Sequence, residues 1–110
     1  MSGPDWDLFE KVPNRFKTVA PKRDIVVTDG MKITLGDATV SIWFTPGHTD
    51  GTNSFTFQVL DRGRPVNIVN SGGAALVYEW EKPEWSIKNL ATYTASQRHL
   101  AETTTTKFAR

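Results

Sequence analysis

Alternating apolar and polar positions in the middle of the chain predict a β-sheet. Over residues 38–44 the two kinds of side chain alternate strictly, so they should point to opposite faces of one strand. One face would carry Ala38, Val40, Ile42 and Phe44, and the other Thr39, Ser41 and Trp43. Residues 54–59 alternate in the same way and predict a second half-buried strand. Shorter runs at 25–28, 31–35 and 66–70 are also typical of strands.

Turn residues separate these runs at short intervals, as they do between antiparallel strands. Asp29-Gly30 lies between the runs 25–28 and 31–35, and this dipeptide predicts a hairpin. Further turns are predicted at Gly36-Asp37 and over 61–65. The polar segment 45–54 joins the two strands with the clearest alternation, and its proline and glycines favour a tight, irregular loop.

Two helices are predicted outside the strands. Residues 2–12 begin with Ser2 as a capping residue and an early proline, which is typical of a helix start. Residues 84–102 place their apolar side chains on one broad helical face, and the four threonines at 103–106 should then end the helix. Loops are expected at 13–24 and 71–75, with an irregular segment at 76–83. The sequence therefore predicts an α+β fold with an antiparallel-rich sheet and flanking helices.

Length and composition exclude several classes of function. A chain of 110 residues suffices for one domain and is too short for two. With 13 basic and 12 acidic residues the net charge is +1, so we expect no nucleic acid and no membrane as a partner. The chain has no cysteine, which excludes disulfides, thiolate catalysis and cysteine-based zinc sites. No run approaches the roughly 20 apolar residues of a membrane span, and no signal peptide is visible, so the location stays open.

The loop 45–54 carries the most informative candidate residue, His48. A neutral imidazole on such a loop can bind a metal ion, although a lone histidine in a turn also fits a purely structural role. Catalytic zinc generally takes three protein ligands. The second histidine, His99, lies in the predicted helix with no partner four residues away, and it is predicted to be a surface residue. Asp37 and Asp50 have no spacing that requires a shared metal.

Residues 71–75 form a second candidate loop. Ser71 lacks the glycine context of a nucleophile elbow and has no assigned base. The backbone amides around Gly72 and Gly73 could bind an anion, but the lysine of a phosphate-binding loop is missing. A plain turn remains an open interpretation of this segment.

Together the runs 29–37 and 45–49, followed by a Ser/Thr-rich strand, resemble the metallo-β-lactamase superfamily and in particular its subclass B3. The resemblance covers about residues 20–76, and residues 84–102 resemble the helix that follows. It implies an αβ/βα sandwich with one or two zinc ions at the sheet edge. The implied activity is zinc-dependent hydrolysis of a small-molecule substrate of the β-lactam, lactone or thioester type.

The resemblance also implies roles for individual residues. His48 matches the histidine that completes the first zinc site, so it is expected to be a metal ligand. Ser71, or its neighbour Gly72, falls near a position held by a metal-bridging acid in sister hydrolases and often by a serine in this branch. Ser71 is therefore expected to contact the substrate. Asp50 stands where these loops commonly carry proline, which could loosen the turn or add a carboxylate near the metal.

Other parts of the family pattern are absent from this sequence. The His-x-His-x-Asp-His motif and the last histidine ligand are missing, so residues 1–110 are expected to be a single, partial domain of a longer hydrolase and inactive by themselves. The resemblance allows a periplasmic or secreted location. The alternative is a non-catalytic β-rich module that binds or interacts with a partner and retains the loop for its shape. The missing ligands favour this alternative, as do three aromatic residues expected at the surface, Trp43, Tyr78 and Trp80.

Overall fold

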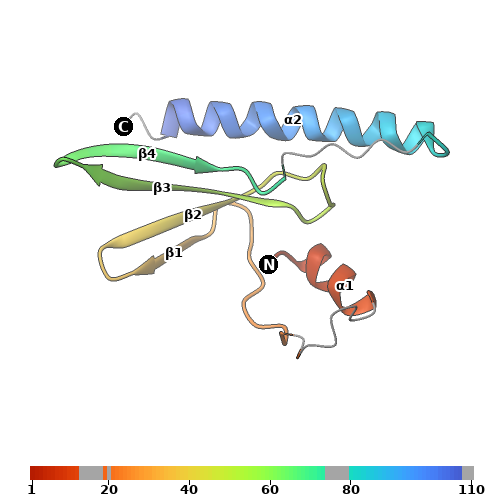
Figure 1. The fold of residues 1–110 in the computed structure, drawn as a ribbon, viewed down its shortest axis with the longest axis horizontal. Coiled ribbons are helices and arrows are strands. Elements are labelled where there is room, and N and C mark those ends of the chain that lie inside the picture. The colour runs from red at the N-terminus through yellow and green to blue at the C-terminus, as the bar shows by residue number, and fades with distance from the viewer. Residues whose placement is uncertain (13–18, 20, 74–79, 108–110) are drawn as a thin grey trace.

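The structure, a computed structural model, describes residues 1–12, 19, 21–73 and 80–107, with only the backbone described at 104–107. Its elements are α1 (Gly3–Lys11), β1 (Lys32–Leu35), β2 (Ala38–Phe44), β3 (Asn53–Asp61), β4 (Arg64–Asn70) and α2 (Pro83–Lys107). The strands form one antiparallel sheet in the order β1-β2-β3-β4 (Figure 1). This arrangement confirms the predicted α+β fold with an antiparallel sheet and flanking helices.

The strand register gives the sheet one polar and one apolar face. Directly paired residues share a face, and Ser41 pairs with Thr56 while Val40 pairs with Phe57. The predicted alternation of β2 and β3 is therefore confirmed. We call the face that carries Val40 and Phe57 the apolar face; it consists of Ile33, Leu35, Val40, Ile42, Phe55, Phe57, Val59, Val66 and Ile68.

Helix α2 covers the polar face of the sheet. The ring of His99 on α2 meets the ring of Trp43 edge-on at a centroid distance of 6.2 Å, and the Trp43 indole donates to Thr56 Oγ1 at 2.8 Å. Trp43 was expected at the surface, but these contacts make it half-buried. Trp80 is 85% exposed, as predicted. Tyr78 lies outside the described residues.

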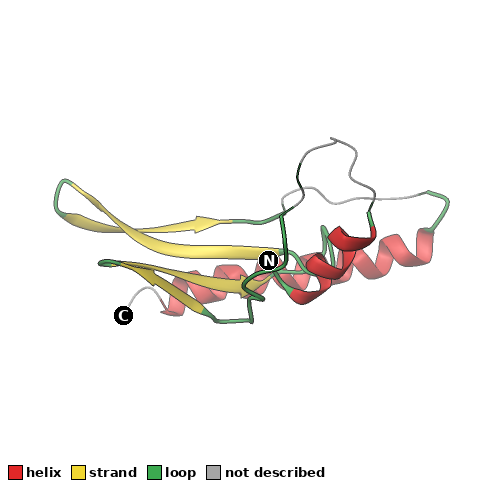
Figure 2. Ribbon diagram, turned by 90° about the horizontal axis from the view of Figure 1, so that it is seen from below, coloured by secondary structure: helices red, strands yellow, loops and turns green. Residues whose placement is uncertain are grey.

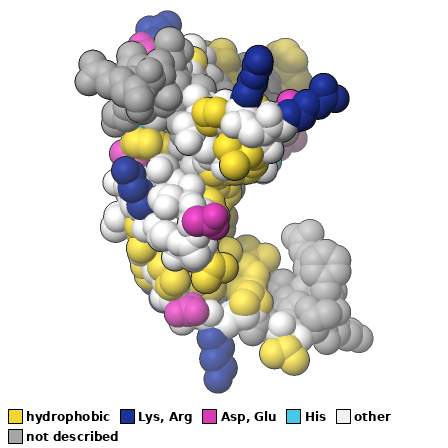
Figure 3. All heavy atoms as spheres, turned by 90° about the vertical axis from the view of Figure 1, so that its left-hand side faces the viewer, with side chains coloured by type: hydrophobic (Ala, Val, Ile, Leu, Met, Phe, Trp, Pro, Cys, Tyr) yellow, Lys and Arg dark blue, Asp and Glu magenta, His cyan; other side chains and the backbone are white. Residues whose placement is uncertain are grey.

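The apolar face is largely uncovered. Of its side chains Ile42 is buried, whereas Val59 and Val66 remain 41% and 38% exposed. Hydrophobic side chains gather along the hollowed side of the molecule in Figure 3. Neither helix in the described part of the chain is long and apolar enough to cross a membrane.

The predicted strand 25–28 and its hairpin are wrong. Within this segment only Val27 pairs, and its partner is Ser2 in a parallel bridge, with Val27 N–H donating to the Met1 carbonyl at 3.1 Å. Asp29-Gly30 does form a turn, but Gly30 N–H donates to Ile42 O at 2.7 Å. The segment before the turn therefore pairs with the residues that precede α1 and does not join the sheet.

The end of α2 also differs from the prediction, because the helix runs through the threonines to Lys107. Thr103 is only 3% exposed, so burial outweighs the low helix propensity of this residue. Within the helix the hydroxyls of Thr92 and Thr94 donate to the carbonyls of Lys88 and Leu90 at 3.1 and 2.9 Å, which satisfies them locally.

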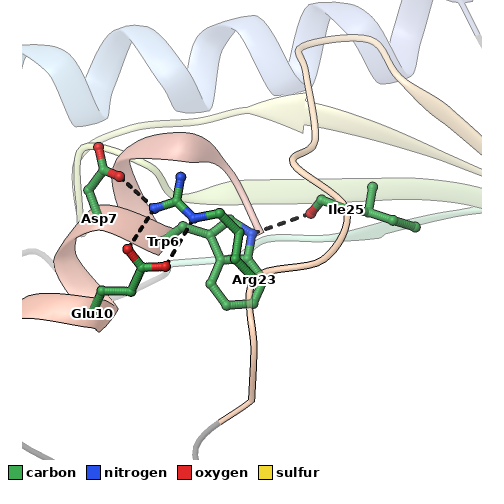
Figure 4. A network of polar contacts seen from close by, with 5 residues as sticks. All are labelled: Trp6, Asp7, Glu10, Arg23 and Ile25. Carbon is green, nitrogen blue, oxygen red and sulfur yellow. Dashed lines mark hydrogen bonds and ion pairs between the residues drawn. The ribbon is translucent and has the colours of Figure 1, made fainter.

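Helix α1 is tied to the segment before β1 (Figure 4). Arg23 binds Asp7 at 2.6 Å and Glu10 at 3.0 Å, and the indole of Trp6 donates to the Ile25 carbonyl at 3.3 Å. The hydrogen bond from Arg23 lowers the pKa of Asp7 below its ordinary value of 3.8. These contacts anchor α1 to the segment that precedes β1.

Candidate functional site

The His48 loop, residues 45–52, connects β2 to β3 and is closed at its base by hydrogen bonds. Thr45 N–H donates to Thr52 O at 2.9 Å, and the hydroxyls of Thr45 and Ser54 lie 2.6 Å apart. All three side chains are buried. The two strands therefore enter the loop at a fixed separation.

Inside the loop a second set of bonds folds the chain back on itself. Gly47 N–H donates to Thr49 O at 3.0 Å, and Thr49 N–H donates to Thr52 Oγ1 at 2.8 Å. Gly47 has φ = 145°, and a Cβ there would lie 2.7 Å from Tyr93 Cβ. Only glycine suits both the backbone conformation and the close approach to α2.

Helices hold the loop on two sides, and Figure 2 shows both of them with the sheet. From α2, the Ser96 hydroxyl donates to Pro46 O at 2.7 Å. From α1, the carboxylate of Asp5 accepts from the Thr49 hydroxyl at 2.7 Å. Ser2, just before α1, donates from its hydroxyl to Gly51 O at 2.6 Å. Hydrogen bonds thus fix the loop at several points.

His48 lies exposed at the tip of this loop, beside a cavity of about 270 Å³. The cavity is lined by Pro4, Asp5, Leu8, His48, Thr49, Asp50, Trp85 and Asn89. The Nδ2 of Asn89, one of these lining residues, is buried without a hydrogen-bond acceptor. A carboxylate, an amide and an imidazole therefore converge on one hollow with an apolar wall.

The Ser71 loop is brought next to His48. A Cβ added at Gly73 would lie 2.5 Å from His48 Cβ, and Gly72 N–H donates to Ser54 Oγ at 3.1 Å. A Cβ at Gly72 would overlap the backbone carbonyl of Asn53. The two glycines thus let this segment pass close to the His48 loop. Ser71 itself is exposed, and its expected contact with a substrate stays a prediction.

Other candidates lie apart from this loop. Asp37 is in the turn at the opposite end of β2, which at seven residues is roughly 20 Å long. His99 is exposed on α2 and packs against Trp43. In the described ranges no three His, Cys, Asp or Glu side chains are grouped to hold a metal ion. His48 therefore has no complete ligand set within this part of the chain.

Sequence reasoning missed three contributors to the site. Ser2 was expected to cap α1, but it makes no side-chain cap bond and its hydroxyl binds Gly51 O instead. Asp5 and Asn89 had no sequence signal, because each reaches the loop or the cavity only through the fold.

Comparison with solved structures identifies the fold. LRA-12, a class B3 di-zinc metallo-β-lactamase from an Alaskan soil metagenome, matches 71% of this chain with a TM-score of 0.55 and 22% identity. GOB-18 from Elizabethkingia meningoseptica matches 74% of it (TM-score 0.52, 26% identity), and BJP-1 from Bradyrhizobium japonicum matches 70% (TM-score 0.53, 26% identity). No protein-family model matches the sequence, and no curated protein matches it closely.

The chain therefore has part of the metallo-β-lactamase fold, and its structural similarity is to subclass B3. It spans only 30%, 30% and 31% of the length of LRA-12, GOB-18 and BJP-1. The predicted resemblance and fold are confirmed at this level. LRA-12 is a di-zinc enzyme, and zinc binding by this chain is a proposal.

Proposed function

We propose that this chain supplies one zinc ligand, His48, to the centre of a zinc-dependent hydrolase. The observation that carries the proposal is the position of His48: it lies on a loop fixed by α1, α2 and the Gly73 segment, at the edge of a cavity. The 26% identity to GOB-18 over 74% of the chain supports the same reading.

The metal-binding side chains of the described residues limit what the chain can contribute to a zinc centre. Catalytic zinc needs three protein ligands and a position for water, and the described residues offer one suitably placed imidazole. They fit one corner of such a centre, so the other ligands must come from outside the described residues. When bound, zinc would lower the pKa of a water and polarise a substrate carbonyl.

Ser71 is proposed to contact the substrate, because its loop passes next to His48. The substrate class is a small molecule with a hydrolysable acyl bond, such as a β-lactam, a lactone or a thioester. Nothing in the charge of the chain, which is +1, points to nucleic acid or a membrane surface.

Genomic sequence provides the first test. The DNA immediately upstream of the segment that encodes this chain should contain an in-frame His-x-His-x-Asp-His motif. Its absence would refute the hydrolase proposal and leave the alternative, a non-catalytic binding module. The uncovered apolar face and the 85% exposed Trp80 are the observations that favour that alternative.

A chimaera provides the second test. The part of GOB-18 that matches this chain is replaced by this chain, and zinc content and β-lactam hydrolysis are measured. We expect His48→Ala to lower the zinc content, and to lower hydrolysis by more than the roughly 10–100-fold typical of losing an outer-shell partner. His99→Ala is the matched control and should change neither. Full zinc occupancy in the His48→Ala chimaera would contradict the ligand assignment.

A further inference from the structure

The beginning of α1 lies against the His48 loop, although Asp5 and Thr49 are 44 residues apart in the sequence. The Asp5 carboxylate accepts from the Thr49 hydroxyl. Close by, the fully buried Ser2 donates to the Gly51 carbonyl. The two contacts thus hold the residues that closely follow His48.

The carboxylate also sets the direction of a short hydrogen-bond chain. An ionised carboxylate only accepts, so Thr49 must donate its hydroxyl proton to Asp5 at 2.7 Å. The Thr49 oxygen is then left to accept from the Thr52 hydroxyl at 2.8 Å, and Thr52 Oγ1 in turn accepts from Thr49 N–H at 2.8 Å. The Asp5 carboxylate, in the first turn of α1, therefore fixes the Thr49 backbone amide next to His48 through the hydroxyls of Thr49 and Thr52.

The His48 loop packs tightly against the beginning of α1. A Cβ at Gly51 would lie 2.6 Å from Asp5 Oδ1 and would overlap Ser2 Oγ. Helix α1 is itself anchored independently, through Arg23 to Asp7 and Glu10 and through the buried Trp6. The loop therefore packs against a helix that is itself anchored through other residues.

We propose that Asp5, assisted by Ser2, is a positioning residue for His48. By fixing Thr49 it holds the adjacent imidazole in one orientation at the cavity. This inference rests on the proposed function, in which His48 binds zinc, because metal ligands depend on outer groups that fix their orientation. Gly73 also lies close to His48 Cβ and limits the space around this side chain.

The test uses NMR on the 110-residue chain without metal. Asp5→Ala and Thr49→Val remove the acceptor and the donor, whereas Asp5→Asn and Thr49→Ser each keep an oxygen in place. We expect roughly tenfold or greater acceleration of hydrogen exchange at the Thr49 amide in the first pair, since hydrogen bonds to charged groups are the stronger ones. The χ1 couplings of His48 should change from those of one rotamer to an average. The second pair should largely restore both readouts.

Two controls separate positioning from general stability. The ring signals of His99, which packs against Trp43 and does not contact Asp5 or Thr49, should stay unchanged in every variant. Asp7→Asn removes the same charge from α1 without touching the loop. Unchanged exchange and couplings in folded Asp5→Ala, or equal effects in Asp7→Asn, would overturn the positioning role. If the alanine variant unfolds, the contrast of Thr49→Val with Thr49→Ser decides in its place. These measurements need no zinc, so their failure is distinct from failure of the chimaera test.

Discussion

Replacing Gly47 by alanine tests the closest approach between the His48 loop and α2. The new Cβ would lie 2.7 Å from Tyr93 Cβ and 2.8 Å from Tyr93 Cα. Because one of these atoms belongs to the helix backbone, no rotation of a side chain relieves the contact. The loop and the helix would have to move apart, which would also strain the bond from Ser96 to Pro46 O.

Two costs add in this variant. Holding a non-glycine residue at φ = 145° costs about 1–3 kcal/mol, and overpacking costs about 1–3 kcal/mol more. The expected loss of about 2–6 kcal/mol is a large part of the roughly 5–15 kcal/mol that stabilises a typical domain. Gly36→Ala is the matched control: Gly36 has φ = 62° but no atom within 4 Å of the added Cβ. It should cost only the backbone strain, about 1–2 kcal/mol.

Urea unfolding followed by fluorescence of the four tryptophans measures both variants. We expect Gly47→Ala to lose at least about 1 kcal/mol more than Gly36→Ala, which is the lower bound of the overpacking cost. Adding Tyr93→Ala should not restore stability, because the Cβ and Cα that cause the contact remain. Equal losses in the two glycine variants, or rescue by Tyr93→Ala, would refute the close-packing argument.

Three further outcomes follow from the same contacts. Gly73→Ala should displace the His48 side chain, read as changed His48 ring shifts with the fold intact; unchanged shifts would contradict the contact at 2.5 Å. Asp7 has a lowered pKa in the folded state, so its contribution to stability is present above pH 3.8 and is lost as the pH falls through the lowered value. Arg23→Gln should raise the pKa of Asp7, measured by NMR titration, toward its ordinary value of 3.8, and an unchanged pKa would contradict the role of this hydrogen bond. Ser96→Ala should cost about 1 kcal/mol in urea unfolding, the net value of one hydrogen bond, and no loss would show that the bond is dispensable.

The sheet could be predicted from the sequence because its signal is local. The side chains of β2 and β3 alternate with period two, and the register then follows from which residues must share a face. The same local reasoning failed for 25–28, whose β-rich composition is satisfied by pairing Val27 with Ser2. It also failed at Thr103, where burial against the rest of the fold decides the end of the helix.

The site was predictable only in part, for a related reason. The proline, glycines and histidine of the loop are consecutive, so they form a pattern. Asp5 and Ser2 act on the loop across 44 and 49 residues of sequence, and one serine before a helix looks like an ordinary cap. Long-range hydrogen bonds of this kind leave no periodic trace in a single sequence.

The geometry of the site does not depend on whether the apolar face of the sheet is buried. Helix α2 covers the side that carries Thr56 and Ser54, which are 1% and 0% exposed, and its His99 ring contacts Trp43, whose indole donates to Thr56 within the sheet. The bonds described for the His48 loop come from α1, α2 and the strand ends, while the side chains of the apolar face contribute none of them. Covering that face would add stability in proportion to the area removed from water, by about 25 cal/mol per Å². It would not need to change the loop, so the orientation of His48 is set by the contacts within this chain.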